Sequence, residues 1–128
     1  MGMQSALATR IEAAGTIAGD RVHWVAVPQD TALPYIRMQT ASDPRPEHLK
    51  DYHGARQTRV QVDCFAERYA QARALAEAVI AGMATPAVVE GVRFGRGKAT
   101  GPRDLGDDTT GKFVHRASVD LLVEHTLA

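Results

Sequence analysis

A glycine-rich segment carries the motif that comes nearest to known chemistry. Residues 106–113, GDDTTGKF, match the G-x-x-x-x-G-K part of a phosphate-binding loop. Such a loop also needs a Ser or Thr for magnesium and a helix N-terminus beside the phosphate. Here Phe113 follows the lysine, Asp107 and Asp108 would repel phosphate, and a strand pattern comes next. We therefore interpret the segment as a glycine-rich turn, and GRGK at 95–98 matches the motif less well still.

Side chains that could bind a metal do not form a recognisable set. Asp104, Asp107 and Asp108 lack the alternating oxygens and the terminal Glu of a calcium loop. The histidines offer neither H-E-x-x-H nor a cysteine at zinc spacing; they are His23, His48, His53, His115 and His125. We expect His48 and His53 on a surface loop and His115 near the edge of the core. The sequence predicts no metal and no cofactor.

Candidate nucleophiles are equally few. Cys64 is the only cysteine, so no internal disulfide can form, and it lies on the apolar side of a strand pattern. A reactive thiol needs an exposed, electropositive setting, so we expect a small buried hydrophobe there. No serine lies in G-x-S-x-G, and no local motif assembles titratable groups. We therefore expect a protein that is not an enzyme.

Charge gives little reason to expect nucleic-acid or membrane binding by the whole chain. Fifteen basic residues balance fifteen acidic ones, which leaves no general field for phosphates. Arg93, Arg96, Lys98 and Arg103 do gather, but neighbouring aspartates offset them and few aromatics interleave. An ordinary charged loop is favoured there over a nucleic-acid contact.

Length and hydropathy indicate one globular domain. A chain of 128 residues can bury a single core. No apolar run approaches the roughly 20 residues that span a bilayer, and the N-terminus lacks the pattern of a signal peptide. We expect a soluble protein made in the cytosol.

The strongest structural signal is a strand that runs into a helix at residues 56–83. Val60, Val62 and Cys64 alternate with polar residues, as in a strand with one wet face. After residue 68 the apolar residues recur at helical spacing; they are Tyr69, Ala72, Leu75, Ala76, Val79, Ile80 and Met83. A one-sided helix beside a half-buried strand predicts an α+β fold with the helix on one sheet face.

Weaker patterns complete the predicted fold. Helical spacing predicts a short N-terminal helix at about 3–14, packed on the sheet's edge. Strands are predicted at 21–25, 35–41 and 113–124, with another at 88–94. Exposed loops are predicted near 42–54 and 95–111, the latter as a long mobile loop or hairpin tip. Together these elements predict an antiparallel or mixed sheet of about four to five strands, with a long helix packed on one face and a short N-terminal helix.

Charge pairing suggests a register between strands 58–65 and 114–121. If Gln61 faces Ser118, then Arg59 lies opposite Asp120 and Asp63 lies opposite Arg116. The same register places apolar residues opposite one another on the covered face; the pairs are Val60 with Val119 and Val62 with Ala117.

Three segments carry a family resemblance, in the order in which they occur. They are the stretch 28–36 with its LPYI, the strand 59–65 with its Ala-rich helix, and the closing strand 116–123. The chain resembles the tail completion, or tail terminator, proteins of long-tailed phages and gene transfer agents. The resemblance covers nearly the whole chain.

The resemblance implies an α/β subunit of the virion, located at the head-proximal end of the tail. It implies a six-membered ring on the tail tube that stops tube growth and joins the head connector. The implied partners are further copies of the chain, the tail tube protein and the connector protein, with a passing contact with DNA in the lumen. Two alternatives are another head-tail connector ring protein and a small dimeric ligand-binding or regulatory module.

The polar face of the predicted sheet is the candidate site, as a ring contact or as lining of the lumen. A plain solvated face is the alternative. Its members are Arg59, Gln61, Asp63, Arg116, Ser118 and Asp120. The glycine-rich segment adds further interface candidates: Lys98, Arg103, Asp104, Asp107 and Asp108.

Overall fold

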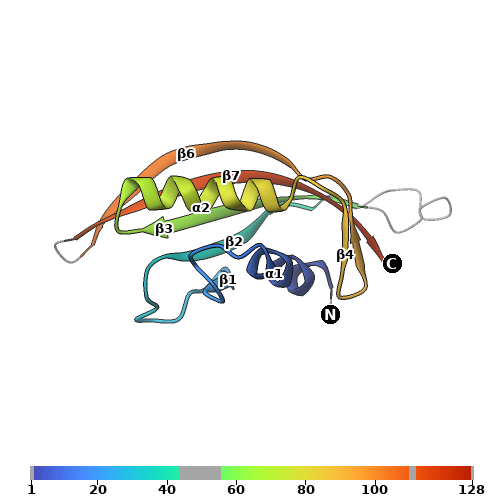
Figure 1. The fold of residues 1–128 in the computed structure, drawn as a ribbon, viewed down its shortest axis with the longest axis horizontal. Coiled ribbons are helices and arrows are strands. Elements are labelled where there is room, and N and C mark those ends of the chain that lie inside the picture. The colour runs from blue at the N-terminus through green and yellow to red at the C-terminus, as the bar shows by residue number, and fades with distance from the viewer. Residues whose placement is uncertain (1, 44–55, 110–111, 128) are drawn as a thin grey trace.

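The chain folds into two helices and a seven-stranded mixed sheet (Figure 1). The computed structural model describes residues 2–43, 56–109 and 112–127. The helices are α1 (Met3–Ala13) and α2 (Tyr69–Gly82). The strands are β1 (Val22–Trp24), β2 (Tyr35–Ser42), β3 (Arg56–Ala66), β4 (Ala87–Val89), β5 (Val92–Phe94), β6 (Lys98–Thr109) and β7 (Lys112–Leu127). The α+β class is confirmed, whereas the expected four to five strands were too few.

The sheet is organised around the long strand β7. The strand order is β1-β2-β3-β7-β5-β4, and β6 also pairs with β7. One edge of β7 therefore holds two partners in succession, β6 along residues 112–122 and β5 along residues 125–127. All pairs are antiparallel except β1 with β2.

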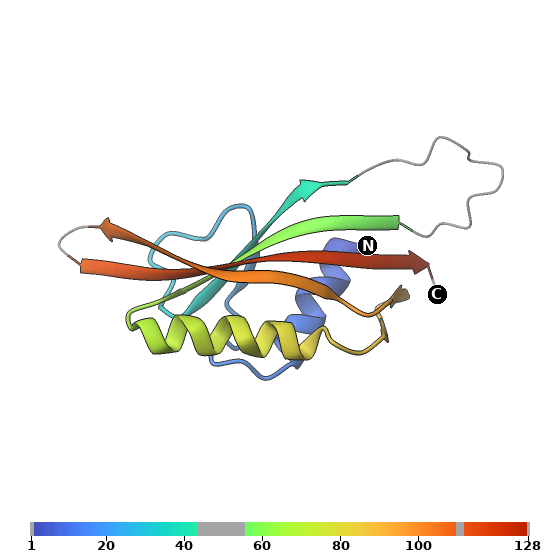
Figure 2. The same ribbon diagram turned by 90° about the horizontal axis from the view of Figure 1, so that it is seen from above.

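Helix α2 covers one face of β3 and β7, as predicted (Figures 1 and 2). Its buried residues Ala72, Leu75, Ala76 and Val79 belong to the same core as Val60, Val62 and Leu121 of the sheet. Apolar residues on alternate strand positions and on one helix stripe can meet only on one sheet face. The packing of strand and helix therefore follows directly from the two periodicities.

Helix α1 contacts β1 and β4, the strands at the two ends of the sheet order. The sheet thus curls around the core, and α1 closes it. Arg10 ties α1 to the end of α2, because its Nη2 donates to the carbonyl oxygens of Gly82, at 3.2 Å, and Thr85. Its guanidinium also lies 5.4 Å from the ring centroid of Phe94, over the ring.

Residues 88–94 form a hairpin and not the single strand that was expected. Glu90 and Gly91 have φ of 49° and 77° and link β4 to β5. Two-residue loops with positive φ at both positions match the twist of paired strands. The Glu90 carboxylate accepts hydrogen bonds from Thr9 and, at 2.8 Å, from Ser5, and these bonds lower its pKa. The hairpin is thereby held against α1.

Segment 95–111, predicted as a long mobile loop or hairpin tip, is a paired strand over most of its length. Residues 98–109 form β6, so the segment belongs to a hairpin with β7. The ladder is irregular between Thr100 and Arg103, where Gly101 has φ of 107°. An edge strand can be polar on both faces because pairing, not burial, holds it, and Gly and Pro fit at a bulge. The predicted loop at 42–54 lies almost wholly outside the described residues.

Strands β3 and β7 are adjacent and antiparallel, but the predicted register was wrong by two residues. Gln61 pairs with Asp120 instead of Ser118, and Asp63 pairs with Ser118 instead of Arg116. Arg59 lies opposite Leu122, so neither predicted charge pair faces across the ladder. A shift of two preserves which side chains share a face. The predicted polar and apolar faces of β3 and β7 are therefore correct despite the error in register.

Candidate functional site

Most predicted site residues share the sheet face opposite α2, which we call the open face. Cross-strand partners lie on the same face of a sheet, so the ladders identify its members. They include Arg37, Arg59, Gln61, Asp63, Lys98, Arg103, Arg116, Ser118 and Asp120. Neither described helix packs on this face. The structure thus brings Lys98 and Arg103 beside the polar residues of β3 and β7.

Asp104 does not belong to this group. It pairs with Ala117 and so lies on the α2 face, where it accepts a hydrogen bond from Tyr69 Oη at 3.2 Å. Its other oxygen is 3.5 Å from Arg73 Nη1. The side chains of Asp107 and Asp108 lie outside the described part of the chain.

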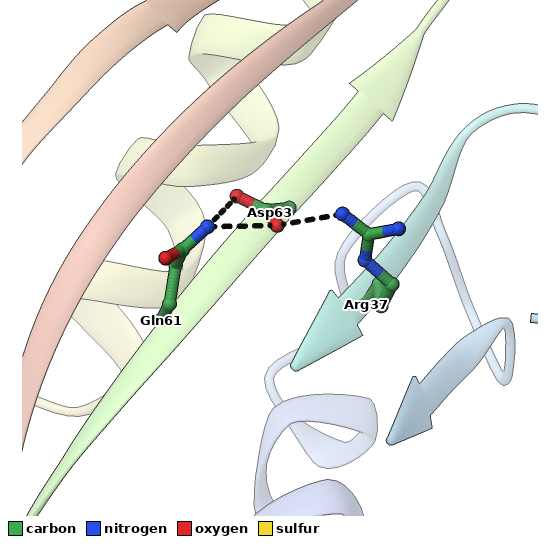
Figure 3. Close-up of polar contacts among 3 residues, drawn as sticks. All are labelled: Arg37, Gln61 and Asp63. Carbon is green, nitrogen blue, oxygen red and sulfur yellow. Dashed lines mark hydrogen bonds and ion pairs between the residues drawn. The ribbon is translucent and has the colours of Figure 1, made fainter. Parts of the chain in front are cut away.

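A buried carboxylate lies at the centre of the open face (Figure 3). Asp63 is 0% exposed. Its Oδ2 accepts from Arg37 Nη2 at 3.1 Å, and Gln61 Nε2 lies 3.1 Å from both oxygens. The ionic partner of Asp63 is therefore Arg37 of β2, and not Arg116 as the sequence analysis predicted. A charge removed from water needs such a partner to remain ionised at acceptable cost.

Phe65 packs beside this group and links the two arginines of the face. Tyr35 stacks on it with ring centroids 4.8 Å apart. The guanidinium carbons of Arg37 and Arg116 lie 5.2 and 5.9 Å from the Phe65 centroid. Arg37 thus contacts both a carboxylate and an aromatic ring, an arrangement that holds a planar guanidinium well.

The open face is basic although the chain is neutral. Among the side chains that the structure describes, its basic members are Arg37, Arg59, Arg93, Lys98, Arg103 and Arg116, against the acidic Asp63, Asp120 and Glu124. Buried polar atoms without a hydrogen-bond partner in the described structure include Arg37 Nε, Arg116 Nε and Ser118 Oγ.

A second polar cluster, which the sequence did not reveal, joins the start of β3 to the end of β7. Thr58 is fully buried, and its hydroxyl donates to Asp43 Oδ1 at 3.0 Å. That hydroxyl also lies 2.8 Å from His125 Nε2, which must then donate to it. Arg56 Nη2 pairs with the other oxygen of Asp43. The Thr58 hydroxyl donates its proton to the hydrogen bond with Asp43, so His125 is not placed to act as a base toward it.

A pocket of about 730 Å³ opens beside this cluster, and we call it the end pocket. It is lined by Arg56, Gln57, Pro86, Ala87, Val88, Arg93, Phe94, Gly95, Glu124, His125 and Thr126. Its residues come from β3, the β4–β5 hairpin and β7, so no local motif could have indicated it.

The protein should become less stable as the pH is lowered, and part of this loss should depend on His125. Burial, and next the charge of Arg56, lower the pKa of His125, while Asp43 acts in the opposite direction. The unfolded chain takes up this proton near pH 6.5 and the folded chain only at lower pH. The free energy of unfolding should therefore fall as the pH drops through about 6.5 and change no further, from this group, below the folded pKa.

Urea unfolding at pH 7.5 and 5.5 tests this effect with His125→Gln, which keeps a side-chain N–H for Thr58. The variant should lose less stability on acidification than the wild type. His23→Gln is the matched control in β1 and should retain the wild-type pH dependence. Equal pH dependence in all three proteins would contradict the role of His125.

The remaining predicted side chains are placed as follows. Cys64 is fully buried, as expected, and burial followed by the charge of Asp63 raises the pKa of its thiol to about 12. His115 is half-buried and contacts Tyr69 and Phe113. No group of three metal-binding side chains occurs among the described residues. In that same part of the chain, neither helix has the length and apolarity to cross a membrane.

Comparison with known proteins identifies the family. The model of the family "Tail completion protein gp17" matches residues 1–124. The chain belongs to this tail completion family. Membership makes it a structural protein of a phage-like tail and confirms the resemblance seen in the sequence.

Solved structures share the fold at low sequence identity. A chain from the virion of a native gene transfer agent particle aligns with a TM-score of 0.63 and 14% identity, over 97% of this chain and 94% of that one. A second solved chain aligns with a TM-score of 0.54 and 14% identity, over 99% of this chain and 97% of that one. No curated protein matches the sequence.

Proposed function

We propose that this tail completion protein is a tail terminator, which forms a ring on the head-proximal end of the tail tube. The ring ends tube growth and provides the surface that the head connector binds. The observation that carries the proposal is the family match over residues 1–124. The fold shared with a chain of a gene transfer agent virion is consistent with it.

The open face supplies chemistry that suits such an assembly. Its basic side chains surround a buried, neutralised carboxylate, so its accessible charge is mainly positive. A neighbouring subunit, the tail tube or DNA passing through the lumen could each present acidic groups to it. The ring would use two different patches of each subunit, as closed head-to-tail rings require.

Deletion of the gene tests the proposal by electron microscopy of the resulting particles. Tails should become abnormally long or remain unattached to heads, and a plasmid copy of the wild-type gene should restore normal particles. Tails of normal length that fail to join heads would favour the alternative, another ring of the head-tail connector. Normal, joined particles would contradict both functions.

A further inference from the structure

The two ends of the sheet carry unlike surfaces that could meet in neighbouring copies. The β6–β7 hairpin closes one end, and the β4–β5 hairpin and the C-terminal end of β7 form the other (Figures 1 and 2). Phe113 and His125 lie near the two ends of β7. They are twelve residue steps apart along the strand, or about 40 Å.

An exposed aromatic group, the hairpin-end patch, lies at the first end. It consists of Tyr69, Phe113 and His115, with Phe113 53% and Tyr69 50% exposed. The His115 ring lies edge-on to Phe113 at 4.8 Å and to Tyr69 at 6.0 Å. Gly106 backs the patch, because a Cβ there would come within 2.2 Å of the Phe113 ring. The absence of a Cβ at this glycine leaves room for the tip of the Phe113 ring.

The end pocket at the opposite end is large enough to accept an aromatic side chain. Its volume of about 730 Å³ falls within the range of about 300–1,000 Å³ that is usual for ligand sites. Pro86 and Val88 provide apolar lining, and Val88 is 55% exposed, whereas Phe94 is fully buried beneath the pocket. Aromatic side chains gain most from such a site, since each buries about 150–250 Å².

Charge agrees with the same pairing. Arg93 lines the end pocket beside the acidic Glu124, and Arg56 lines it as well but is already paired with Asp43. Asp104 lies beside the hairpin-end patch through its bond to Tyr69, and its side chain is 54% exposed although Arg73 is near. Opposite charges at the rims of two apolar surfaces favour one orientation of docking.

We propose that the hairpin-end patch of one copy docks into the end pocket of the next copy. A patch cannot reach the pocket of its own chain across about 40 Å, so the contact must be between copies. Because it joins unlike surfaces, it is heterologous and propagates from copy to copy until a ring closes. This inference rests on the proposed ring and names the two surfaces that would form it.

Cysteine crosslinking in assembled particles tests the contact. The variant carries Arg73→Cys, which leaves the patch intact and lies beside it through Asp104, together with Val88→Cys, and is treated with a short bismaleimide. Cys64 should not react because it is fully buried. The expected result is a ladder of crosslinked trimers and larger species. Arg73→Cys alone should give no crosslinked product, and Arg73→Cys with Ile17→Cys is the matched control, because Ile17 is 54% exposed and lies at neither surface.

The outcomes separate the docking contact from the proposed function. A ladder confined to the Arg73/Val88 variant supports the contact. Equal crosslinking in the controls, or normal particles that contain the variant but give no ladder, overturns the contact and leaves the terminator function intact. If the wild-type chain is absent from particles, the terminator function fails. Crosslinking of the purified chain at high concentration then decides the contact by the same criteria.

Discussion

Asp63→Asn should lower the free energy of unfolding by about 2–3 kcal/mol. The carboxylate is 0% exposed, and its oxygens are taken by Arg37 and Gln61. Removing its charge leaves the Arg37 guanidinium without an ionic partner. The Arg37 side chain is 29% exposed, so water offsets part of the loss and the cost stays below the roughly 3–5 kcal/mol of a fully buried pair. Urea denaturation at one protein concentration measures the change.

Asp120→Asn is the matched control on the same face. Asp120 lies opposite Gln61, and no ion pair of Asp120 is found among the described residues. Its replacement should change stability by less than about 0.5 kcal/mol. In an Arg37→Gln background, Asp63→Asn should cost at least about 1 kcal/mol less than in the wild type, because the two residues act on each other. Equal costs in both backgrounds would show that the pair contributes nothing.

The sequence could predict the open face but not the ionic pairs on it. Alternation along β3 and β7 assigns Asp63 and Ser118 to the polar side, and this assignment holds in every register shifted by an even number of residues. The partner of Asp63 changes with each such shift. Charge complementarity made Arg116 a plausible partner. The observed ladder places Ser118 opposite Asp63, and Arg37 of β2 supplies the positive charge beside it.

Elsewhere, elements with a regular apolar periodicity could be predicted from the sequence, whereas features held by long-range pairing could not. Strand β3 and helix α2 bury residues at fixed periods, so both elements can be recognised from the sequence. Strand β6 has Gly101 and Pro102 at its irregularity and no apolar alternation, because pairing with β7 holds it. The end pocket combines Arg56, Arg93 and His125, and only the long-range pairing of β3, β5 and β7 brings these residues together.

Phe94→Ala should destabilise the fold by about 3–5 kcal/mol. Phe94 is fully buried and is among the largest side chains in the core. Its ring supports the Arg10 guanidinium, which in turn bonds to the carbonyl oxygens at the end of α2. The truncation thus removes apolar contacts and loosens the group that joins α1 to α2. Urea denaturation should show an earlier midpoint with an unchanged slope.

Phe113→Ala makes the same chemical change at a 53% exposed position. Its cost in unfolding free energy should stay below about 1 kcal/mol, because little of the ring is withdrawn from water. If Phe113 docks into the end pocket of a neighbouring copy, its removal should weaken assembly and leave the monomer folded. Phe94→Ala should impair both, because Phe94 is fully buried in the core and supports the pocket from beneath. Comparable losses of stability in the two variants would contradict the core role assigned to Phe94.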